Sequence, residues 1–308
     1  MTRSDVASPH EVDAIVAATA RLVEGCRRRL EQLHSATLLE ITIAAQPRRR
    51  RVRLGGRVLV RRALSVVVDA IVAMLPAPWC CDATAVRVAA PRRWQALGAG
   101  VTRVYSAHPG LTGRWALATE LVPNDGAVGI LLERQGWTCI RALDATVGWI
   151  DARLGPRCPA PSLPRPTTTD ARVMSAVART WCSVPYRLGG RTRAGIDCSA
   201  LVQRVALDAL GVVLPRHSRD QLGLGCRPQV GPETPGTLVF VWGANEPCGH
   251  VGIRTEAGTV VHASTSRGQV VEDSLMRFLR DARDVAHVPF SAILPPWAAS
   301  VGIAHRDG

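Results

Sequence analysis

The sequence contains no lysine and almost no asparagine. All 38 Lys+Arg positions are arginine, and the two asparagines are Asn124 and Asn245. Both depletions indicate a GC-rich coding sequence, so we read the net charge of +13 mainly as a property of composition that also suits anionic ligands. The clearest basic cluster, Arg48–Arg51, has no interleaved aromatic residues of the kind a base-stacking surface needs. The sequence therefore predicts a solvated hairpin turn there, and no nucleic-acid partner.

Long apolar runs are also missing. The nearest candidate, Ala63–Leu75, has 13 residues and contains Asp69, whereas a membrane helix needs about 18 apolar residues or more. We expect a buried helix there and no membrane span. The first 30 residues include Glu11, Asp13 and Glu24 and offer no apolar core before a small-residue cleavage site. A cytoplasmic protein is therefore expected, with an extracellular or cell-wall location as the alternative.

None of the nine cysteines forms a C-x-x-C pair, and histidine and cysteine never cluster at zinc-ligand spacing. We therefore expect no metal and no cofactor. The odd count leaves at least one thiol unpaired within the chain, and a cytoplasmic location favours reduced thiols. The cysteines are Cys26, Cys80, Cys81, Cys139, Cys158, Cys182, Cys198, Cys226 and Cys248.

A length of 308 residues predicts two domains, or three small ones. The clearest boundary is Gly155–Asp170, where five prolines predict a semi-rigid spacer that is neither helix nor ladder strand. The expected order is an N-terminal α+β region of unknown role at 1–95, a small β-barrel at 96–154, a linker at 155–172, a C-terminal α+β domain at 173–296 and a tail at 297–308.

Hydrophobic spacing in the N-terminal region predicts a helix over Val12–Leu33, whose apolar stripe is interrupted only by Thr19. Two strands are expected at Leu38–Ala44 and Val52–Val60, with Gly55-Gly56 as a possible tight turn. No residue pattern in this region points to a particular chemistry.

Residues 101–153 alternate short apolar runs with turn signals, which is typical of a small barrel. The passage resembles a bacterial Src-homology-3-like barrel, because Trp137, Gly148 and Trp149 stand where that barrel carries a Trp after a turn and a Gly-Trp near its end. The two tryptophans either fill the core or contact a ligand. The predicted strands are Gly126–Leu132, Trp137–Arg141 and Thr146–Asp151.

A candidate nucleophile stands at the start of an amphipathic helix in the last third of the chain. Cys198 precedes an apolar-periodic run that ends at Gly211. Free backbone N–H groups and the helix dipole at such a position favour a thiolate, so a lowered pKa is expected. Taken alone, a buried inert cysteine would be the commoner interpretation.

Two histidines further along the chain favour catalysis. His250 lies in an expected strand at Gly249–Ile253 and His262 in one at Val260–Ser264. A hairpin reversing near Glu256 would place the imidazoles roughly opposite one another, and their even separation of 12 puts both on one face. One histidine could then take the thiol proton while the other orients it.

In this order the residues resemble the NlpC-type family of bacterial cell-wall cysteine peptidases, which have a papain-like α+β core. The resemblance runs from Val173 to about Leu294. It implies that Cys198 is the nucleophile, His250 the general base and acid, and His262 the group that orients His250. It further implies that Tyr186 lies near the oxyanion together with the Cys198 N–H. The matching motifs are Tyr186 with Gly189-Gly190, Asp197-Cys198-Ser199, Leu214-Pro215-Arg216 with Ser218 and Gln221, Pro235-Gly236, Gly249–Ile253 and His262-Ala263.

The sequence departs from the commonest family pattern at Ala200, Leu188 and Thr237, none of which belongs to the expected triad. We expect these departures to affect substrate contacts and not the reaction type.

A Src-homology-3-like barrel followed by this type of peptidase domain resembles the domain arrangement of enzymes that recycle muropeptides. This resemblance implies cleavage between γ-D-glutamate and a diamino acid in peptides with a free N-terminal L-alanine. By position, Asp197, Ser199 and Tyr186 would hold the free amine, which a carboxylate suits. Asp197 could equally be the N-cap of the helix. The alternatives are an exported wall-lytic hydrolase and a papain-like binding or acyl-transfer effector without hydrolytic activity.

Overall fold

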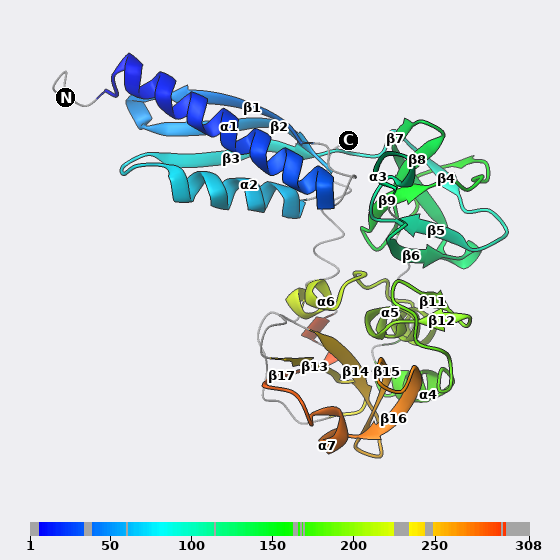
Figure 1. The fold of residues 1–308 in the computed structure, drawn as a ribbon. Coiled ribbons are helices and arrows are strands. Elements are labelled where there is room, and N and C mark those ends of the chain that lie inside the picture. The colour runs from blue at the N-terminus through cyan, green and yellow to red at the C-terminus, as the bar shows by residue number, and fades with distance from the viewer. Residues whose placement is uncertain are drawn as a thin grey trace.

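The computed structural model describes residues 6–33, 39–59, 61–113, 115–162, 166, 168, 170–224, 234–243, 249–290 and 292–293. Two of the cysteines, Cys226 and Cys248, and the expected tail at 297–308 lie outside the described residues. No helix among the described residues is both long and apolar enough to cross a membrane. Figure 1 shows the secondary structure in three groups that follow one another along the chain.

The first group combines two helices with a three-stranded mixed sheet of order β1-β2-β3, in which β2 and β3 are parallel. The apolar stripe of the first helix packs into a core with Val52 and Ile71, and Thr19 within that stripe is fully buried. Strand β3 was not predicted, because most of its residues are only partly buried and the alternation is weak. The elements are α1 (Pro9–Leu33), β1 (Leu39–Gln46), the 3-10 turn η2 (Pro47–Arg49), β2 (Arg51–Val58), α2 (Arg61–Met74) and β3 (Cys80–Val88).

The tight turn predicted at Gly55-Gly56 is wrong, since both glycines lie inside β2. Gly56 has a φ of +107°, and a Cβ there would lie 1.8 Å from the backbone oxygen of Glu40 on β1. Glycine is required at this position because the two backbones approach too closely for any side chain. The chain reverses instead at Pro47–Arg50, between the paired residues Gln46 and Arg51, and Arg50 adopts a left-handed conformation with a φ of 44°.

The second group is a seven-stranded sheet of order β10-β4-β7-β8-β9-β5-β6, in which every strand pairing is antiparallel. The three predicted strands are present as β7, β8 and β9. Closure of this sheet into a barrel stays a prediction. The elements are β4 (Arg93–Ala96), β5 (Thr102–Tyr105), α3 (Pro109–Thr112), β6 (Leu117–Leu121), the 3-10 turn η3 (Pro123–Asp125), β7 (Ala127–Arg134), β8 (Trp137–Arg141), β9 (Val147–Ile150) and β10 (Arg157–Cys158).

The proline-rich segment was expected to hold no ladder strand, and this is wrong for two residues. Arg157 and Cys158 form β10 and pair with Gln95 and Trp94 at the edge of the sheet. Proline excludes only its own N–H from a ladder, and these two residues lie between prolines and keep theirs.

Trp137 and Trp149, the two tryptophans that match the Src-homology-3-like barrel, have different surroundings. Trp149 is buried at 3% exposure in a cluster with Leu131 and Cys139, so it fills the core. Trp137 is partly exposed and packs edge-on against Tyr105 and Trp115, with ring centroids 5.8 and 5.7 Å away. Core packing therefore accounts for Trp149 and only in part for Trp137.

The third group is an α+β unit whose five-stranded antiparallel sheet has the order β16-β15-β14-β13-β17. Strands β16 and β17 were not predicted. Helices α4 and α5 contact the sheet at β14 and β15 and share its apolar core. The elements are α4 (Val173–Arg179), β11 (Arg191–Thr192), β12 (Gly195–Ile196), α5 (Cys198–Leu210), α6 (Ser218–Leu224), β13 (Leu238–Trp242), β14 (His250–Arg254), β15 (Thr259–Ser264), β16 (Gln269–Ser274), α7 (Leu275–Phe278) and β17 (Asp284–Val288).

Candidate active site

Helix α5 begins at Cys198, as the sequence predicts. Asp197 is the N-cap, and its Oδ1 accepts a hydrogen bond from the Ala200 N–H at 2.9 Å. The buried face of α5 includes Leu201 and Val205. The helix ends in a left-handed Gly211 with a φ of 70°, where carbonyl groups of the last turn accept its N–H. The helix therefore fixes the position of the Cys198 sulfur at its N-terminal end.

The backbone N–H groups of Ser199 and Val251 lie close enough to the Cys198 sulfur to lower the pKa of the thiol. Burial opposes them more strongly, with a smaller contribution from the Asp197 carboxylate, and together they raise that pKa to about 12. The sequence prediction of a lowered pKa is therefore wrong for the resting site, because desolvation exceeds what the helix end supplies. The Cys198 residue still keeps partial solvent exposure.

The two predicted imidazoles lie side by side on β14 and β15. Nε2 of His250 is 2.8 Å from Nδ1 of His262, and the rings meet edge to face with centroids 5.0 Å apart. Val251 directly follows His250 and belongs to the apolar core against which Cys198 packs, so the imidazole pair and the start of α5 lie near one another.

Both histidines lie on one sheet face, as predicted, but they are not directly opposite. The β14–β15 ladder pairs Ile253 with Val261, and continuing it places Gly252 opposite His262. His250 and His262 are therefore diagonal neighbours, a spacing that long side chains still bridge. A Cβ on Gly252 would lie 3.2 Å from the Cβ of His262. It would also lie 2.4 Å from Cγ1 of Val260, so glycine lets β15 pack closely at this position.

Phe278 of α7 covers the imidazole pair, with its ring centroid 5.4 Å from that of His250 and 4.9 Å from that of His262. Burial lowers the pKa of His250 to about 3, and the neighbouring His262 adds to the effect. Burial also lowers the pKa of His262. The resting site therefore pairs a neutral thiol with neutral imidazoles.

Asp197 and Ser199 belong to a closed polar network around Arg216, whose side chain is 3% exposed. The guanidinium binds both oxygens of the Asp197 carboxylate, and Nη1 donates to Ser199 Oγ at 2.9 Å. Asp197 Oδ2 also accepts the Gly189 N–H at 2.9 Å. The N-cap interpretation of Asp197 is confirmed. Recognition of a substrate amine by Asp197, Ser199 and Tyr186 stays a prediction.

Tyr186 lies in the segment before α5, with its N–H donated to the Gly268 carbonyl at 2.7 Å. Burial raises the pKa of Tyr186 to about 12, and the nearby Cys198 and Asp197 contribute to the rise. The phenol is therefore protonated and can donate a hydrogen bond near the sulfur.

Strand β6 of the second group contacts the segment that leads into α5, a junction that the sequence did not reveal. Glu120, 2% exposed, accepts the Arg191 N–H and the Thr192 hydroxyl at 3.2 Å each and pairs with the Arg187 guanidinium. Nε of Arg216 donates to Thr119 Oγ1 at 3.1 Å. In the sequence, Glu120 and Thr119 look like ordinary polar surface residues, so their burial at this junction could not be predicted.

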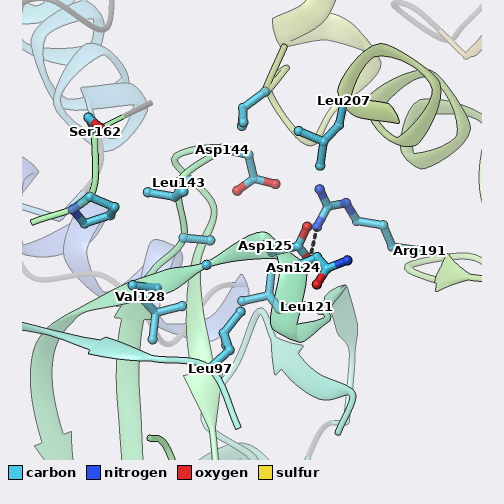
Figure 2. Close-up of a pocket in the computed structure, with 15 residues that line it drawn as sticks. Leu97, Leu121, Asn124, Asp125, Val128, Leu143, Asp144, Ser162, Arg191 and Leu207 are labelled. Atoms are coloured by element: carbon cyan, nitrogen blue, oxygen red, sulfur yellow. Dashed lines mark hydrogen bonds and ion pairs between the residues drawn. The ribbon is translucent and has the colours of Figure 1, made fainter. Parts of the chain in front are cut away.

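A cavity of about 240 Å³ lies at the same junction. Figure 2 shows Arg191 reaching from the third group toward Asp125 of the second, and their ion pair measures 2.7 Å. Leu121 and Leu207 line the cavity from opposite sides. Among the described residues, none of the expected catalytic side chains lines it.

The described residues place a cysteine at the start of a helix that packs against an antiparallel sheet bearing two adjacent histidines, and comparisons with known proteins show what this part of the chain is similar to. Residues 183–285 match the model of the NlpC/P60 family. These residues, about a third of the chain, are similar to that family.

Two curated relatives come from Escherichia coli strain K12. "Probable endopeptidase NlpC" is 39% identical over 98 residues, which cover 32% of this chain and 63% of the relative. "Murein DD-endopeptidase MepS/Murein LD-carboxypeptidase" is 38% identical over 110 residues, covering 36% and 57%. The chain thus spans about three fifths of the length of these relatives. The solved NlpC/p60 domain of the peptidoglycan hydrolase SagA is 26% identical, with 39% of this chain and 99% of that one aligned at a TM-score of 0.34.

Proposed function

We propose that this protein hydrolyses an amide bond in peptidoglycan stem peptides, with Cys198 as nucleophile. One observation carries the proposal. His250, whose Nε2 lies 2.8 Å from Nδ1 of His262, is followed on β14 by Val251, and the Val251 N–H lies close enough to the Cys198 sulfur at the start of α5 to lower the pKa of that thiol. A nucleophile, a base and an orienting group in contact are what acyl transfer by a thiol requires.

In the proposed reaction His250 takes the Cys198 proton as the sulfur attacks the carbonyl carbon of the peptide bond. The tetrahedral intermediate collapses, the C–N bond breaks, and the imidazolium returns the proton to the leaving amine. Water, deprotonated by His250, then hydrolyses the thioester and regenerates the thiol. Because both resting groups are neutral, the thiolate forms during attack and is not present beforehand.

The developing oxyanion needs donors near the sulfur. The protonated Tyr186 phenol is one candidate, because its pKa responds to Cys198. The free backbone N–H of Cys198, at the N-terminus of α5, is the second. Removing one oxyanion donor typically costs about 10²–10³ in rate, so Tyr186→Phe tests this assignment.

For the bond cleaved we propose the link between γ-D-glutamate and the diamino acid. A relative named gamma-DL-glutamyl hydrolase, from Bacillus subtilis, is 38% identical over 105 residues, while MepS is named a DD-endopeptidase. The amine of an N-terminal L-alanine would meet an Asp197 carboxylate that Arg216 already neutralises. We therefore expect the free amine to contribute only modestly to binding.

A panel of defined substrates tests the proposal. The arms are free L-Ala-γ-D-Glu-diamino acid, its N-acetylated form, a D,D-cross-linked stem peptide and intact sacculi, with products identified by mass spectrometry. We expect cleavage of the free tripeptide at the γ-glutamyl bond and only a small loss on acetylation. If only the cross-linked peptide is cleaved, the proposed γ-glutamyl bond is wrong and the D,D bond takes its place. If none of the four substrates is cleaved, the proposal that the protein is a hydrolase is wrong.

We also propose that the protein acts on released fragments in the cytoplasm. Fractionation of cells that produce the full chain tests the location. Recovery from the wall or the medium, together with activity on sacculi, would favour the exported wall-lytic alternative.

A further inference from the structure

A carboxylate follows the imidazole pair on the side away from Cys198. Asp273 lies on β16, its side chain is 13% exposed, and its Oδ2 is 3.4 Å from Nε2 of His262. The β15–β16 ladder pairs Asp273 with Val260, so its side chain reaches His262 diagonally. His250, His262 and Asp273 thus form a line of three groups on the adjacent strands β14, β15 and β16.

The donors and acceptors along this line follow from the chemistry of its last member. An ionised carboxylate only accepts, so Nε2 of His262 must carry a proton. Since His262 is neutral, its Nδ1 is then a lone pair and accepts from Nε2 of His250 at 2.8 Å. His250 is neutral as well, which leaves its Nδ1 as the unprotonated nitrogen.

Without that carboxylate the opposite order is equally possible. His262 could carry its proton on Nδ1 and donate to Nε2 of His250. The proton of His250 would then sit on Nδ1, and the ring nitrogen outside the pair could not accept a proton from Cys198. In serine proteases, a wrong tautomer of the base at intact geometry lowers kcat by about 10⁴.

Two arginines face the other oxygen of the carboxylate. Oδ1 of Asp273 lies 3.6 Å from Nε of Arg277 and 3.9 Å from Nη2 of Arg267. Both arginine side chains are partly exposed, at 46% and 44%. Both guanidinium groups therefore lie on the Oδ1 side of the carboxylate, and Oδ2 is the oxygen directed at His262.

We propose that Asp273 is a positioning residue that fixes the tautomers of His262 and His250, so that Nδ1 of His250 is free to act as the base. This proposal deepens the proposed function and rests on it. It assigns Asp273 no contact with substrate and no change of its own protonation during turnover.

The direct test is ¹⁵N NMR of the histidine side chains in full-length protein without substrate, with signals assigned through His250→Asn and His262→Gln. We expect wild type to show the Nε2–H tautomer at both histidines. In Asp273→Asn the amide can donate to His262 Nε2, so both rings should shift toward Nδ1–H. Unchanged tautomers in Asp273→Asn would overturn the proposal.

Kinetics provide a second readout. We expect Asp273→Asn to lower kcat about 10- to 100-fold with KM nearly unchanged, less than the ~10² to 10⁴ that a base supplies itself. Asp273→Glu keeps an acceptor-only group and should restore the tautomers and most of kcat. The matched control is Glu272→Gln, which removes the adjacent carboxylate on β16 that pairs with Arg179 and should leave both readouts unchanged. A shift in tautomer with no peptide cleaved by wild type would count against the proposed function alone.

Discussion

The first and third groups of elements bury polar residues in very different numbers. In the described part of the first group one polar side chain is buried, Thr19, and it donates to the Ile15 carbonyl at 2.8 Å. The third group, together with β6, buries charged or titratable groups around Cys198. These are Glu120, Arg191, Asp197, Arg216 and His262.

The difference shows which region of the fold contains buried charges that are unfavourable for stability. Burying a charge is unfavourable unless it is paired and hydrogen-bonded. Glu120, Asp197 and Arg216 are all paired, and their partners lie on segments that meet at the start of α5. The first group has no such arrangement among its described residues, whereas the third group concentrates its buried charges near the candidate active site.

The largest effect should come from Cys198→Ala, which removes the nucleophile from the polar site. We expect hydrolysis of the preferred peptide to fall by at least about 10⁴, since nucleophile removal in a comparable triad abolishes nearly all covalent catalysis. Cys182→Ala is the control, because that thiol is also partly buried with a raised pKa. Equal rates of hydrolysis for both variants would mean that Cys198 is not the nucleophile.

Removing a buried carboxylate should reduce stability far more than removing an exposed one. Glu120→Ala leaves the buried Arg191 N–H and the Arg187 guanidinium without their partner, and we expect a loss of about 3 kcal/mol in the free energy of unfolding. The matched control, Glu40→Ala, breaks the exposed Arg57–Glu40 pair and should cost less than about 1 kcal/mol. Urea unfolding measures both, and similar losses would erase the contrast between the regions.

Acid should weaken the third group through its histidines. The pKa of His250 is lowered from 6.5 to about 3 in the folded protein, so between these values the unfolded chain binds a proton that the native site excludes. Stability is therefore full above pH 6.5 and falls as pH drops, by up to about 1.4 kcal/mol per pH unit. His250→Asn should flatten the slope in urea unfolding across this range. An unchanged slope would mean that His250 is not buried as described.

The smallest effect concerns the backbone of the first group. Gly56→Ala places a Cβ against the Glu40 carbonyl at a φ of +107°, and we expect a loss of about 1–3 kcal/mol. Gly25→Ala, on α1 where no atom lies within 4 Å of the added Cβ, should stabilise by up to about 1 kcal/mol. Thermal unfolding distinguishes the two, and a tolerated Gly56→Ala would contradict the close strand approach.

Sequence periodicity predicted the parts of the site that depend on local order. The start of α5 at Cys198 follows from the N-cap and the apolar run, and the shared face of His250 and His262 follows from an even separation. The prediction erred by two residues in the hairpin register, because the turn is centred one residue later than Glu256, which shifts each partner by two and keeps the side-chain face unchanged.

Tertiary contacts decided what the sequence could not predict. The raised pKa of Cys198 comes from burial by elements distant in the chain. The Thr119–Arg216 bond spans 97 residues, and Asp273 reaches His262 only through the β15–β16 pairing. The turn at Gly55-Gly56 was mispredicted because a glycine pair is also what a close strand crossing requires.

The most direct test uses a γ-D-glutamyl peptide bearing a thiol-reactive group at the scissile carbonyl. Full-length protein is labelled near neutral pH, digested and mapped by mass spectrometry over all nine cysteines. The account predicts a single adduct on Cys198 that is lost when His250 is replaced by Asn. Labelling spread across several cysteines, or labelling of Cys198 that does not depend on His250, would contradict it.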